Sequence, residues 1–398
     1  MAGLNPVCCT SYAEDPGSFS FAAPVANQMK PVIAVDARYG LRSPRRGVGE
    51  YVYQVVTHLS AIHSPYQIVL YGDKLFDPET LADLRRIYPV HIVSAVNFFA
   101  WEQWTWPRAA RYAKLLHGTA NIGPLQPSPP QILTVHDVIE WHRGRDFPAE
   151  IPLRHHISRV YRMNALKRLA PRALQILTVS EHARQDIAVT LKVPLNHIAV
   201  TPLAGKFPLC QSPSRWSDPP FVLTLGALDP RKNLKAAFAG FALVSNPELR
   251  LKIVGVEPHG LTQIKALVRD LGLGRRVAVE AMVSDHDLQT LYQRAIVFLY
   301  LSHYEGFGLP VLEAMSQGCP VICAHHASLP EVANDAAILV DPADSHTVAK
   351  HIETLLSDEA YRDDLRQRGL DRARQFSWGK TAELTHRAYI KALEEVKR

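Results

Sequence analysis

The segment that says most about the fold is Ser302-His-Tyr-Glu-Gly-Phe-Gly-Leu-Pro-Val-Leu-Glu-Ala-Met315. It follows the apolar run Ile296-Val-Phe-Leu-Tyr300, which predicts a buried strand. The glycines inside the segment break that pattern, and Pro310 suits the first turn of a helix, where a missing N–H costs nothing. The segment therefore predicts a strand, a glycine turn and a helix N-terminus.

Such a junction is suited to phosphate, because free N–H groups and the positive end of the helix dipole meet there. Glu305 and Glu313 flank the predicted turn. Two carboxylates beside a phosphate would repel it, so their presence here needs a separate reason. Hydroxyl groups of a sugar or a ribose provide one, because they donate hydrogen bonds to carboxylates. The other interpretation is a plain turn with two solvated glutamates.

The size and composition of the chain favour a two-domain intracellular protein. Its 398 residues suit two domains of about 150–200 residues each. Hydrophobic residues make up 47%, yet no apolar run is long enough to span a membrane. The five cysteines are scattered, which indicates reduced thiols in a cytoplasmic protein. Because the sequence has no His-Glu-x-x-His or Cys-x-x-Cys motif, we expect no metal site.

The net charge of +6 is concentrated in the first half of the chain. Residues 1–210 carry 22 Lys and Arg against 15 Asp and Glu, whereas residues 211–398 carry 22 against 23. Much of the excess lies between Arg154 and Arg172. Nucleic acid, an anionic membrane and a phosphorylated substrate all fit this bias, as does a solvated helix face.

Short apolar runs alternate with helical patterns along the whole chain, which is typical of parallel sheets covered by helices on both faces. We therefore predict an α/β fold with two Rossmann-like domains that face each other across a cleft. Predicted strands of the first series lie near Val32–Asp36, Ile68–Tyr71, Val90–Ser94, Ile132–Val135, Ile176–Val179 and His197–Thr201. Those of the second lie near Phe221–Leu225, Leu251–Val254, Val277–Glu280, Val297–Leu301, Val321–Ala324 and Ala337–Val340.

The domain boundaries follow from composition. Residues 1–28 lack the pattern of a secretory signal, so we expect a disordered extension or an upstream start codon. Residues 29–204 form the first predicted domain, and the proline- and serine-rich residues 205–220 form a linker. Residues 221–376 form the second domain, and we expect residues 377–398 to be a helix that returns to the first. Neither domain has a G-x-G-x-x-G or Walker loop after a strand, which disfavours dehydrogenases and Walker-type ATPases.

Two further patches follow predicted strands of the first domain. Gly47 and Gly49 precede a helical pattern, with Arg45 and Arg46 beside them, which suits phosphate as well as an ordinary surface loop. His136 ends another strand, and the next residue is an acid that would orient its ring; a packed histidine is the plainer interpretation.

Arg231 and Lys232 open the second domain, after a strand, Gly226 and a proline turn. An Arg fork and a Lys point charge together suit a diphosphate. The alternative, a basic helix start, is disfavoured by the helix dipole.

The segment Asn97-Phe-Phe-Ala-Trp-Glu-Gln-Trp-Thr-Trp-Pro107 is rich in aromatic residues. They suit stacking on sugar rings, contact with a bilayer surface, or the face of a buried helix.

Taken together, these motifs resemble those of the family 4 retaining glycosyltransferases, which have the GT-B architecture. The resemblance runs from about Pro31 to the C-terminus and is most specific at His303–Val321, the segment with Glu305 and Glu313. The first-domain motifs Asp36-Ala-Arg, Val135-His-Asp and Val179-Ser-Glu also match, as does the loop from Gly226 to Asn233. Exopolysaccharide and O-antigen mannosyltransferases are the members that it resembles most.

The resemblance implies a role for each motif. Arg231 and Lys232 would hold the diphosphate of a nucleotide-sugar, Glu313 its ribose, and Glu305 the hydroxyls of the transferred sugar. His136 would lie beside the anomeric carbon. The implied catalytic residues are His136, Glu305, Lys232 and Arg231. The implied donor-binding residues are Gly226, Arg231, Lys232, Met282, Val283, Glu305, Gly306, Phe307, Gly308, Leu309 and Glu313, and the acceptor and phosphate loop comprises Arg45, Arg46, Gly47 and Gly49.

The resemblance also implies substrates and partners. We expect transfer of mannose from GDP-mannose, with retention and without a metal or other cofactor, to a lipid-linked or oligosaccharide acceptor. The expected location is the cytoplasm, in peripheral contact with the anionic inner face of the cell membrane through Arg154–Arg172 and Phe98–Trp106, and we expect no nucleic-acid partner. Same-face attack is favoured over a covalent intermediate. The alternatives are a nucleotide-sugar epimerase on the same architecture and a non-catalytic subunit that binds the donor.

Overall fold

The computed structural model describes residues 30–147, 153–211, 216–217 and 219–397. The predicted extension over residues 1–28 lies outside the described residues, as does part of the predicted linker. Pro31–Arg398 form one compact unit.

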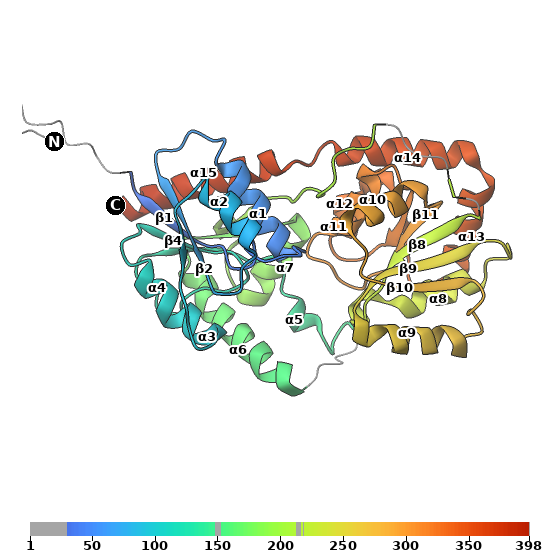
Figure 1. Cartoon of the computed structure of the whole chain (residues 1–398), viewed down its shortest axis with the longest axis horizontal. Helices are drawn as coiled ribbons and strands as arrows, with labels where there is room; N and C mark the ends of the chain where they lie inside the picture. Colours follow the sequence, from blue (N-terminus) through green and yellow to red (C-terminus); the bar gives the residue numbers. More distant parts are fainter. Residues whose placement is uncertain (1–29, 148–152, 212–215, 218, 398) are drawn as a thin grey trace, which may run out of the picture. The chain divides into compact units, whose positions relative to one another are not determined.

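That unit contains two fully parallel sheets (Figure 1). The first has the strand order β3-β2-β1-β4-β5-β6-β7 and the second the order β10-β9-β8-β11-β12-β13. The strands of the first sheet are β1 Val32–Asp36, β2 Gln67–Gly72, β3 Val90–Ile92, β4 Leu115–Gly118, β5 Gln131–Thr134, β6 Gln175–Thr178 and β7 Ile198–Val200. Those of the second are β8 Phe221–Leu225, β9 Arg250–Val256, β10 Val277–Ala281, β11 Val297–Tyr300, β12 Val321–Ala324 and β13 Ile338–Val340.

Helices connect most successive strands in both halves, since parallel pairing requires crossover connections, whereas residues 119–130 join β4 to β5 without a helix. The first half has α1 Val48–Leu59, α2 Pro78–Arg85, α3 Phe98–Ala100, η1 Trp101–Thr105, α4 Trp106–Ala109, α5 Ile139–His142, α6 Leu153–Leu169, η2 Ala170–Arg172, α7 Glu181–Leu191 and η3 Leu195–His197. The second half has η4 Pro230–Lys232, α8 Leu234–Ala242, α9 Pro258–Asp270, α10 Asp285–Arg294, α11 Leu309–Ser316, α12 Leu329–Ala333, η5 Asn334–Ala336, α13 Ser345–Ser357, α14 Glu359–Ala373 and α15 Trp378–Lys397.

Strand order locates the place where a ligand would bind. Each sheet reverses its winding once, between β1 and β4 in the first and between β8 and β11 in the second. In open α/β sheets, ligands bind outside the carboxyl ends of the strands at such a reversal. Arg231 and Lys232 follow β8, and Glu305 follows β11, so the two predicted donor motifs leave neighbouring strands at the reversal.

One strand, β4, is missing from the sequence prediction. Its four residues include His117 and no β-branched side chain, so neither propensity nor pattern indicates a strand. The tertiary structure outweighs this weak local preference, because β4 pairs with β1 on one side and with β5 on the other. Both ring nitrogens of His117 also have hydrogen-bond partners. The His117 ring nitrogens lie 2.6 Å from Tyr389 Oη and 2.8 Å from Thr134 Oγ1.

The C-terminal helix α15 packs against α1 of the first half. Tyr389, on α15, makes the bond to His117 under the first sheet, and His386 Nδ1 lies 2.6 Å from Tyr66 Oη. Trp378 Nε1, at the start of the helix, donates to the carbonyl of Gly205. The last helix of the chain is therefore anchored on the first half, whereas α14 before it packs on α11 of the second.

The aromatic segment divides into a buried and an exposed part. Trp101 and Trp106 are fully buried and stack with centroids 5.4 Å apart, as the buried-helix alternative expects. Phe98, Phe99 and Trp104 are exposed, Trp104 by 62%. The buried-helix alternative therefore holds for Trp101 and Trp106, whereas contact of the exposed residues with a sugar or a membrane stays a prediction.

Candidate active site

Glu305 lies at the centre of a cluster of cationic and hydroxyl groups. Its Oε1 accepts hydrogen bonds from Lys232 Nζ at 2.9 Å, Tyr300 Oη at 2.6 Å and Ser302 Oγ at 2.8 Å. Its Oε2 accepts from Arg231 Nη1 at 2.6 Å. Burial opposes ionisation, but Lys232 and Arg231 outweigh it and lower the pKa of Glu305 to about 2. Glu305 is therefore a buried carboxylate that stays charged at neutral pH.

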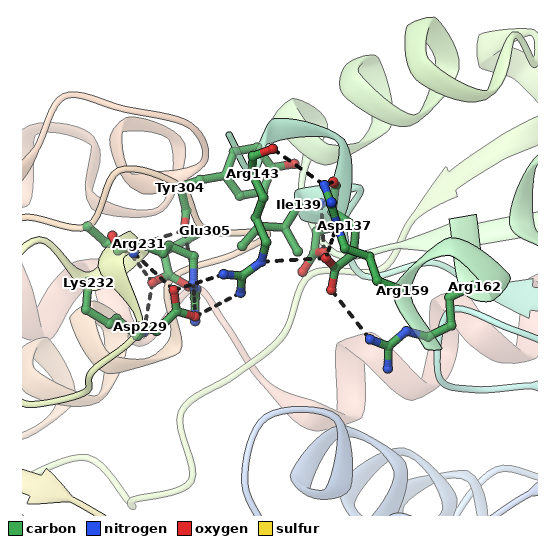
Figure 2. A network of polar contacts seen from close by, with 12 residues as sticks. Asp137, Ile139, Arg143, Arg159, Arg162, Asp229, Arg231, Lys232, Tyr304 and Glu305 are labelled. Carbon is green, nitrogen blue, oxygen red and sulfur yellow. Dashed lines mark hydrogen bonds and ion pairs between the residues drawn. The ribbon is translucent and has the colours of Figure 1, made fainter. Parts of the chain in front are cut away.

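The short turn η4 fixes the two cations. Asp229 caps it by accepting a hydrogen bond from the Arg231 N–H, and Asn233 follows in the left-handed conformation with φ 52°. Asp229 also binds Arg143, from the end of α5, with Arg143 Nη2 3.0 Å from Asp229 Oδ2 (Figure 2). An ion pair therefore connects the cation turn of the second half to the first half of the chain.

The loop that carries Glu305 is held by serines on both sides. Ser328 Oγ donates to the carbonyls of Glu305 and Phe307, and Ser180 Oγ, just before α7, donates to the carbonyl of Gly306 at 2.6 Å. A Cβ on Gly306 would lie 2.6 Å from the carbonyl oxygen of His136. Only glycine allows this approach, which brings the predicted His136 and Glu305 motifs into contact.

Gly308 and Leu309 form the helix start that the sequence predicts. Gly308 is the N-cap of α11 with φ 108°, a conformation that favours glycine, and a Cβ there would meet Leu329. Phe307 is buried and packs edge-on against Phe376. Pro310 has no N–H, and the Val311 and Leu312 N–H groups donate to the Gly308 carbonyl, so the first turn of α11 presents the Leu309 N–H close after Glu305.

His136 is buried and neutral. Burial lowers its pKa to about 4, although its bond to Thr119 favours the charged form. Nε2 lies 3.0 Å from the carbonyl oxygen of Thr119, so Nε2 carries the hydrogen and Nδ1 is the acceptor. The expectation that the following acid orients this ring is wrong, because Asp137 accepts from the Ile139 N–H instead. Thr119, which follows the unpredicted strand β4, takes that role.

Glu313 differs from Glu305 in its surroundings. It lies on α11 beside Gly205, and its carboxylate accepts no hydrogen bond from the described residues. Burial raises its pKa to about 7, with only partial relief from Lys206, whose amine pairs with Asp285 at 2.5 Å. Glu313 can therefore accept hydrogen bonds from a ligand without losing a partner.

The remaining donor residues lie at the edges of this region. A Cβ on Gly226, after β8, would lie 2.5 Å from Val256, so this glycine allows β9 to approach. Met282 follows β10 and is 37% exposed, whereas Val283 packs against the main core. These two residues immediately precede the N-cap of α10.

The predicted acceptor loop forms the N-terminus of α1. Gly47 is its N-cap with φ 48°, and Gly49 packs against the carbonyl oxygen of Tyr39. Arg45 donates to Thr80 at 2.8 Å and its guanidinium covers the ring of Tyr53, so this arginine supports the loop. Arg46 is exposed.

Sequence reasoning gave no role to Tyr300, Ser302 or Arg143. The first two bind Glu305 directly, and their spacing from it, five and three residues, was the only available signal. The role of Arg143 could not be predicted from the sequence, because its partner Asp229 is 86 residues away in the chain.

No cluster of His, Cys, Asp and Glu in the described ranges is arranged to hold a metal ion. Among the helices that the structure describes, none is long and apolar enough to cross a membrane.

Comparison with known proteins was informative for both sequence and fold. Residues 211–372 match the family model described as glycosyl transferases group 1. O-antigen chain mannosyltransferase B of Escherichia coli is 34% identical over 238 residues, which are 54% of this chain and 60% of that protein. MMP alpha-(1->4)-mannosyltransferase of Mycolicibacterium hassiacum is 32% identical over 238 residues, 58% of this chain and 57% of that protein. The matched part of the chain therefore spans about three fifths of each relative.

Solved structures match almost the whole fold. HepE of Anabaena, crystallised with UDP and glucose, has a TM-score of 0.66 at 16% identity, covering 91% of this chain and 99% of that one. WaaG, a glycosyltransferase involved in lipopolysaccharide biosynthesis, has a TM-score of 0.65 at 13% identity, with 90% and 99% covered. These matches confirm the predicted α/β architecture of two parallel sheets. The chain has the GT-B fold, and its sequence resembles O-antigen mannosyltransferases and, over residues 211–372, the group 1 glycosyl transferases.

Proposed function

We propose that this protein is a retaining hexosyltransferase that moves mannose from GDP-mannose to a lipid-linked or glycan acceptor in cell-surface polysaccharide biosynthesis. The observation that supports it best is the cluster of Arg231, Lys232 and Glu305 at the strand reversal, in contact with the His136 segment. The names of the sequence relatives support the choice of mannose.

The cluster suits a diphosphate leaving group. Arg231 and Lys232 supply two positive charges, and the start of α11 adds the Leu309 N–H and the positive end of the helix dipole. Fixed charges aimed at a developing negative charge are the main source of catalysis in such sites. In our proposal these groups take the place of a metal ion. When the donor binds, its diphosphate replaces Glu305 as the partner of Arg231 and Lys232.

The carboxylates are not suited to nucleophilic attack. Glu305 accepts four hydrogen bonds from charged or hydroxyl groups, which lowers its reactivity toward carbon. We assign it to the hydroxyls of the transferred sugar and Glu313 to the ribose. The neutral His136, with Nδ1 as acceptor, suits a hydroxyl of the sugar or of the acceptor. Retention then follows from same-face attack, with the departing phosphate taking the proton of the acceptor.

An exposed patch on the first half of the chain supports contact with a membrane. Phe99 and Trp104 lie beside α6, because Phe99 packs edge-on against Tyr161 and Gln103 donates to the Tyr161 hydroxyl at 2.8 Å. Ile157 and Val160 of α6 are also exposed. Arginines and lysines of the same helix add positive charge, although the side chain of Arg154 lies outside the described residues. We propose that this patch rests on the anionic inner face of the cell membrane.

Co-sedimentation with vesicles tests the membrane contact. We expect binding to anionic vesicles at low salt that falls at high salt. Trp104→Ser should weaken it, whereas Val189→Ser, at an even more exposed apolar site on α7, should not. Equal binding of both variants would contradict the assignment of the patch.

Product analysis tests the activity. The protein is incubated with GDP-mannose with and without lipid-linked sugars, and the products are separated and their anomeric configuration determined by NMR. Transfer only when acceptor is present, with retained α configuration, supports the proposal. A free sugar isomer plus nucleotide would indicate the epimerase, and donor binding without any turnover on a panel of acceptors would indicate the non-catalytic subunit.

A further inference from the structure

A second cluster of polar side chains adjoins the loop of Glu305 from the other side. Asp186, on α7, accepts hydrogen bonds at the same oxygen, Oδ2, from His142 Nε2 at 2.7 Å and from Tyr304 Oη at 2.6 Å. The rings of His142 and Tyr304 stack with centroids 4.5 Å apart. The cluster therefore joins α5 and α7 of the first half to the loop after β11.

Tyr304 transmits any change in this cluster to Glu305. The two residues are neighbours in the chain, and the carbonyl of Tyr304 accepts from Arg231 Nη1 at 3.3 Å. One side of Tyr304 is thus tied to the cation cluster and the other, through its hydroxyl, to Asp186. A shift of the Tyr304 ring would displace the carboxylate that pairs with the cations.

His142 has two alternative partners at Nδ1. Asp146 Oδ2 lies within hydrogen-bond distance of this nitrogen, and Arg145 Nη2 lies 2.8 Å from it. Nδ1 donates to Asp146 only when it carries a hydrogen, and accepts from Arg145 only when it does not. Neutral His142 therefore has one aspartate partner and charged His142 has two. The titratable and charged groups that face it are Arg145 and Asp146 from its own segment, His182 and Asp186 from α7, and Tyr304 from the loop after β11.

We propose that His142 is a positioning residue for the Glu305 loop, which its charged form holds through Asp186 and Tyr304. The inference rests on the proposed function, because it treats the Glu305 loop as part of the donor site. The conformation of that site would then depend on pH. Charged His142 keeps Asp186 ionised and fixed in orientation, so the Tyr304 hydroxyl has a constant acceptor. Neutral His142 bonds to Asp186 more weakly, and the loop gains freedom to move.

The direction of the pH effect follows from the surroundings of His142. Burial disfavours the charged form, but the hydrogen bonds to Asp186 and Asp146 outweigh it and raise its pKa above the ordinary 6.5. A raised pKa means that the stabilisation is fully present below about pH 6.5 and is lost as the pH rises through the higher folded value. Donor affinity should therefore weaken on the alkaline side.

The test uses His142→Gln, which imitates the neutral imidazole. Its amide N–H₂ can donate to Asp186 and its carbonyl can accept from Arg145, but it does not titrate. Thermal unfolding without ligand and the Kd for GDP-mannose are measured from pH 5.5 to 9. We expect the variant to have a lower Tm and a Kd weaker by about tenfold at pH 6, and to match the native protein at pH 9. His63→Gln, at an exposed site, is the matched control.

A second variant separates the bond between His142 and Asp186 from the bond between Asp186 and Tyr304. Tyr304→Phe keeps the His142–Asp186 pair but removes the hydrogen bond from the Tyr304 hydroxyl to Asp186. The pH dependence of Tm should therefore remain, while that of the Kd disappears. If His142→Gln keeps the native pH dependence of both Tm and Kd, the proposal is overturned. If the native protein does not bind GDP-mannose, the proposed function fails, whereas the Tm comparison still decides whether His142 is the titrating group.

Discussion

Glu305 and Glu313 belong to one short segment and are equally exposed, at 8% each, yet their pKa values shift in opposite directions. Burial disfavours the charge on both, but Lys232 and Arg231 hold the pKa of Glu305 near 2. Glu313 has no cation within hydrogen-bond distance among the described residues, and its pKa rises to about 7. The neighbouring charged groups, and not burial, therefore decide which carboxylate of the segment carries a permanent charge.

This difference suggests two kinds of binding group. Glu305 already has four donors, so a ligand must exchange with them, and the diphosphate of the proposed donor does so by taking the two cations. Glu313 has unused acceptor capacity and needs only a ligand hydroxyl.

Removing a charge from the Glu305 cluster should have the largest effect. Glu305→Ala and Lys232→Ala should each lower kcat/KM by on the order of 10²–10³, the scale for losing one group that stabilises developing charge. Steady-state kinetics with saturating acceptor measures it, with His63→Gln as control. Near-normal turnover in both variants would break the assignment of the site.

Glu313→Gln should stabilise the protein while it weakens donor binding. Between pH 4.5, its ordinary pKa, and about 7, native Glu313 binds a proton that the unfolded chain has released, so the native protein loses stability as the pH rises. The amide removes this cost, which corresponds to about 3 kcal/mol at pH 8. Urea unfolding at pH 4.5 and pH 8 measures the gain, which should be confined to the higher pH. An equal gain at both values would show that packing is responsible.

Gly306→Ala should disturb the contact between the two motifs. The new methyl group would lie 2.6 Å from the carbonyl oxygen of His136, so one loop must move. We expect a loss of about 1–3 kcal/mol in unfolding free energy, with a parallel fall in activity. Gly274→Ala is the matched control, because nothing lies within 4 Å of its added Cβ. Equal stability of the two variants would contradict the close approach.

Tyr300→Phe should have the smallest effect of the four. It deletes one oxygen that bonds to Glu305 at 2.6 Å and to Lys232 at 2.5 Å, while the charges remain. We expect a loss of about 1 kcal/mol, seen as a roughly five- to tenfold lower kcat/KM. A loss as large as that of Lys232→Ala would mean that the hydroxyl, and not the charge, is the essential group.

The sequence was sufficient for the parts of this molecule that local pattern determines. Short apolar runs marked twelve of the thirteen strands in the part of the chain that the structure describes, and Gly308 with Pro310 marked the start of α11. Strand β4 was missed because leucine, histidine and glycine carry no strand signal, and its place depends on neighbours on both sides.

The site was predictable as a set of motifs but not as a set of contacts. Residue types and their order identified Glu305, Arg231 and Lys232. The partners of His136 and Asp229 come from distant segments, Thr119 and Arg143, which only the folded chain brings together. The opposite pKa shifts of the two glutamates could not be predicted either, because they depend on which side chains surround each carboxylate in the folded chain.

Calorimetric titration of GDP and GDP-mannose into Glu305→Ala and Glu313→Ala is the most direct test of the central claim that the two carboxylates serve different parts of one donor. We predict that Glu313→Ala weakens both ligands by the same factor, about tenfold, because the ribose is common to them. Glu305→Ala should leave GDP binding unchanged or tighter, since its cations are released, and should remove the preference for GDP-mannose. Loss of GDP binding in Glu305→Ala together with native binding in Glu313→Ala would contradict the assignment of Glu305 to the sugar and Glu313 to the ribose.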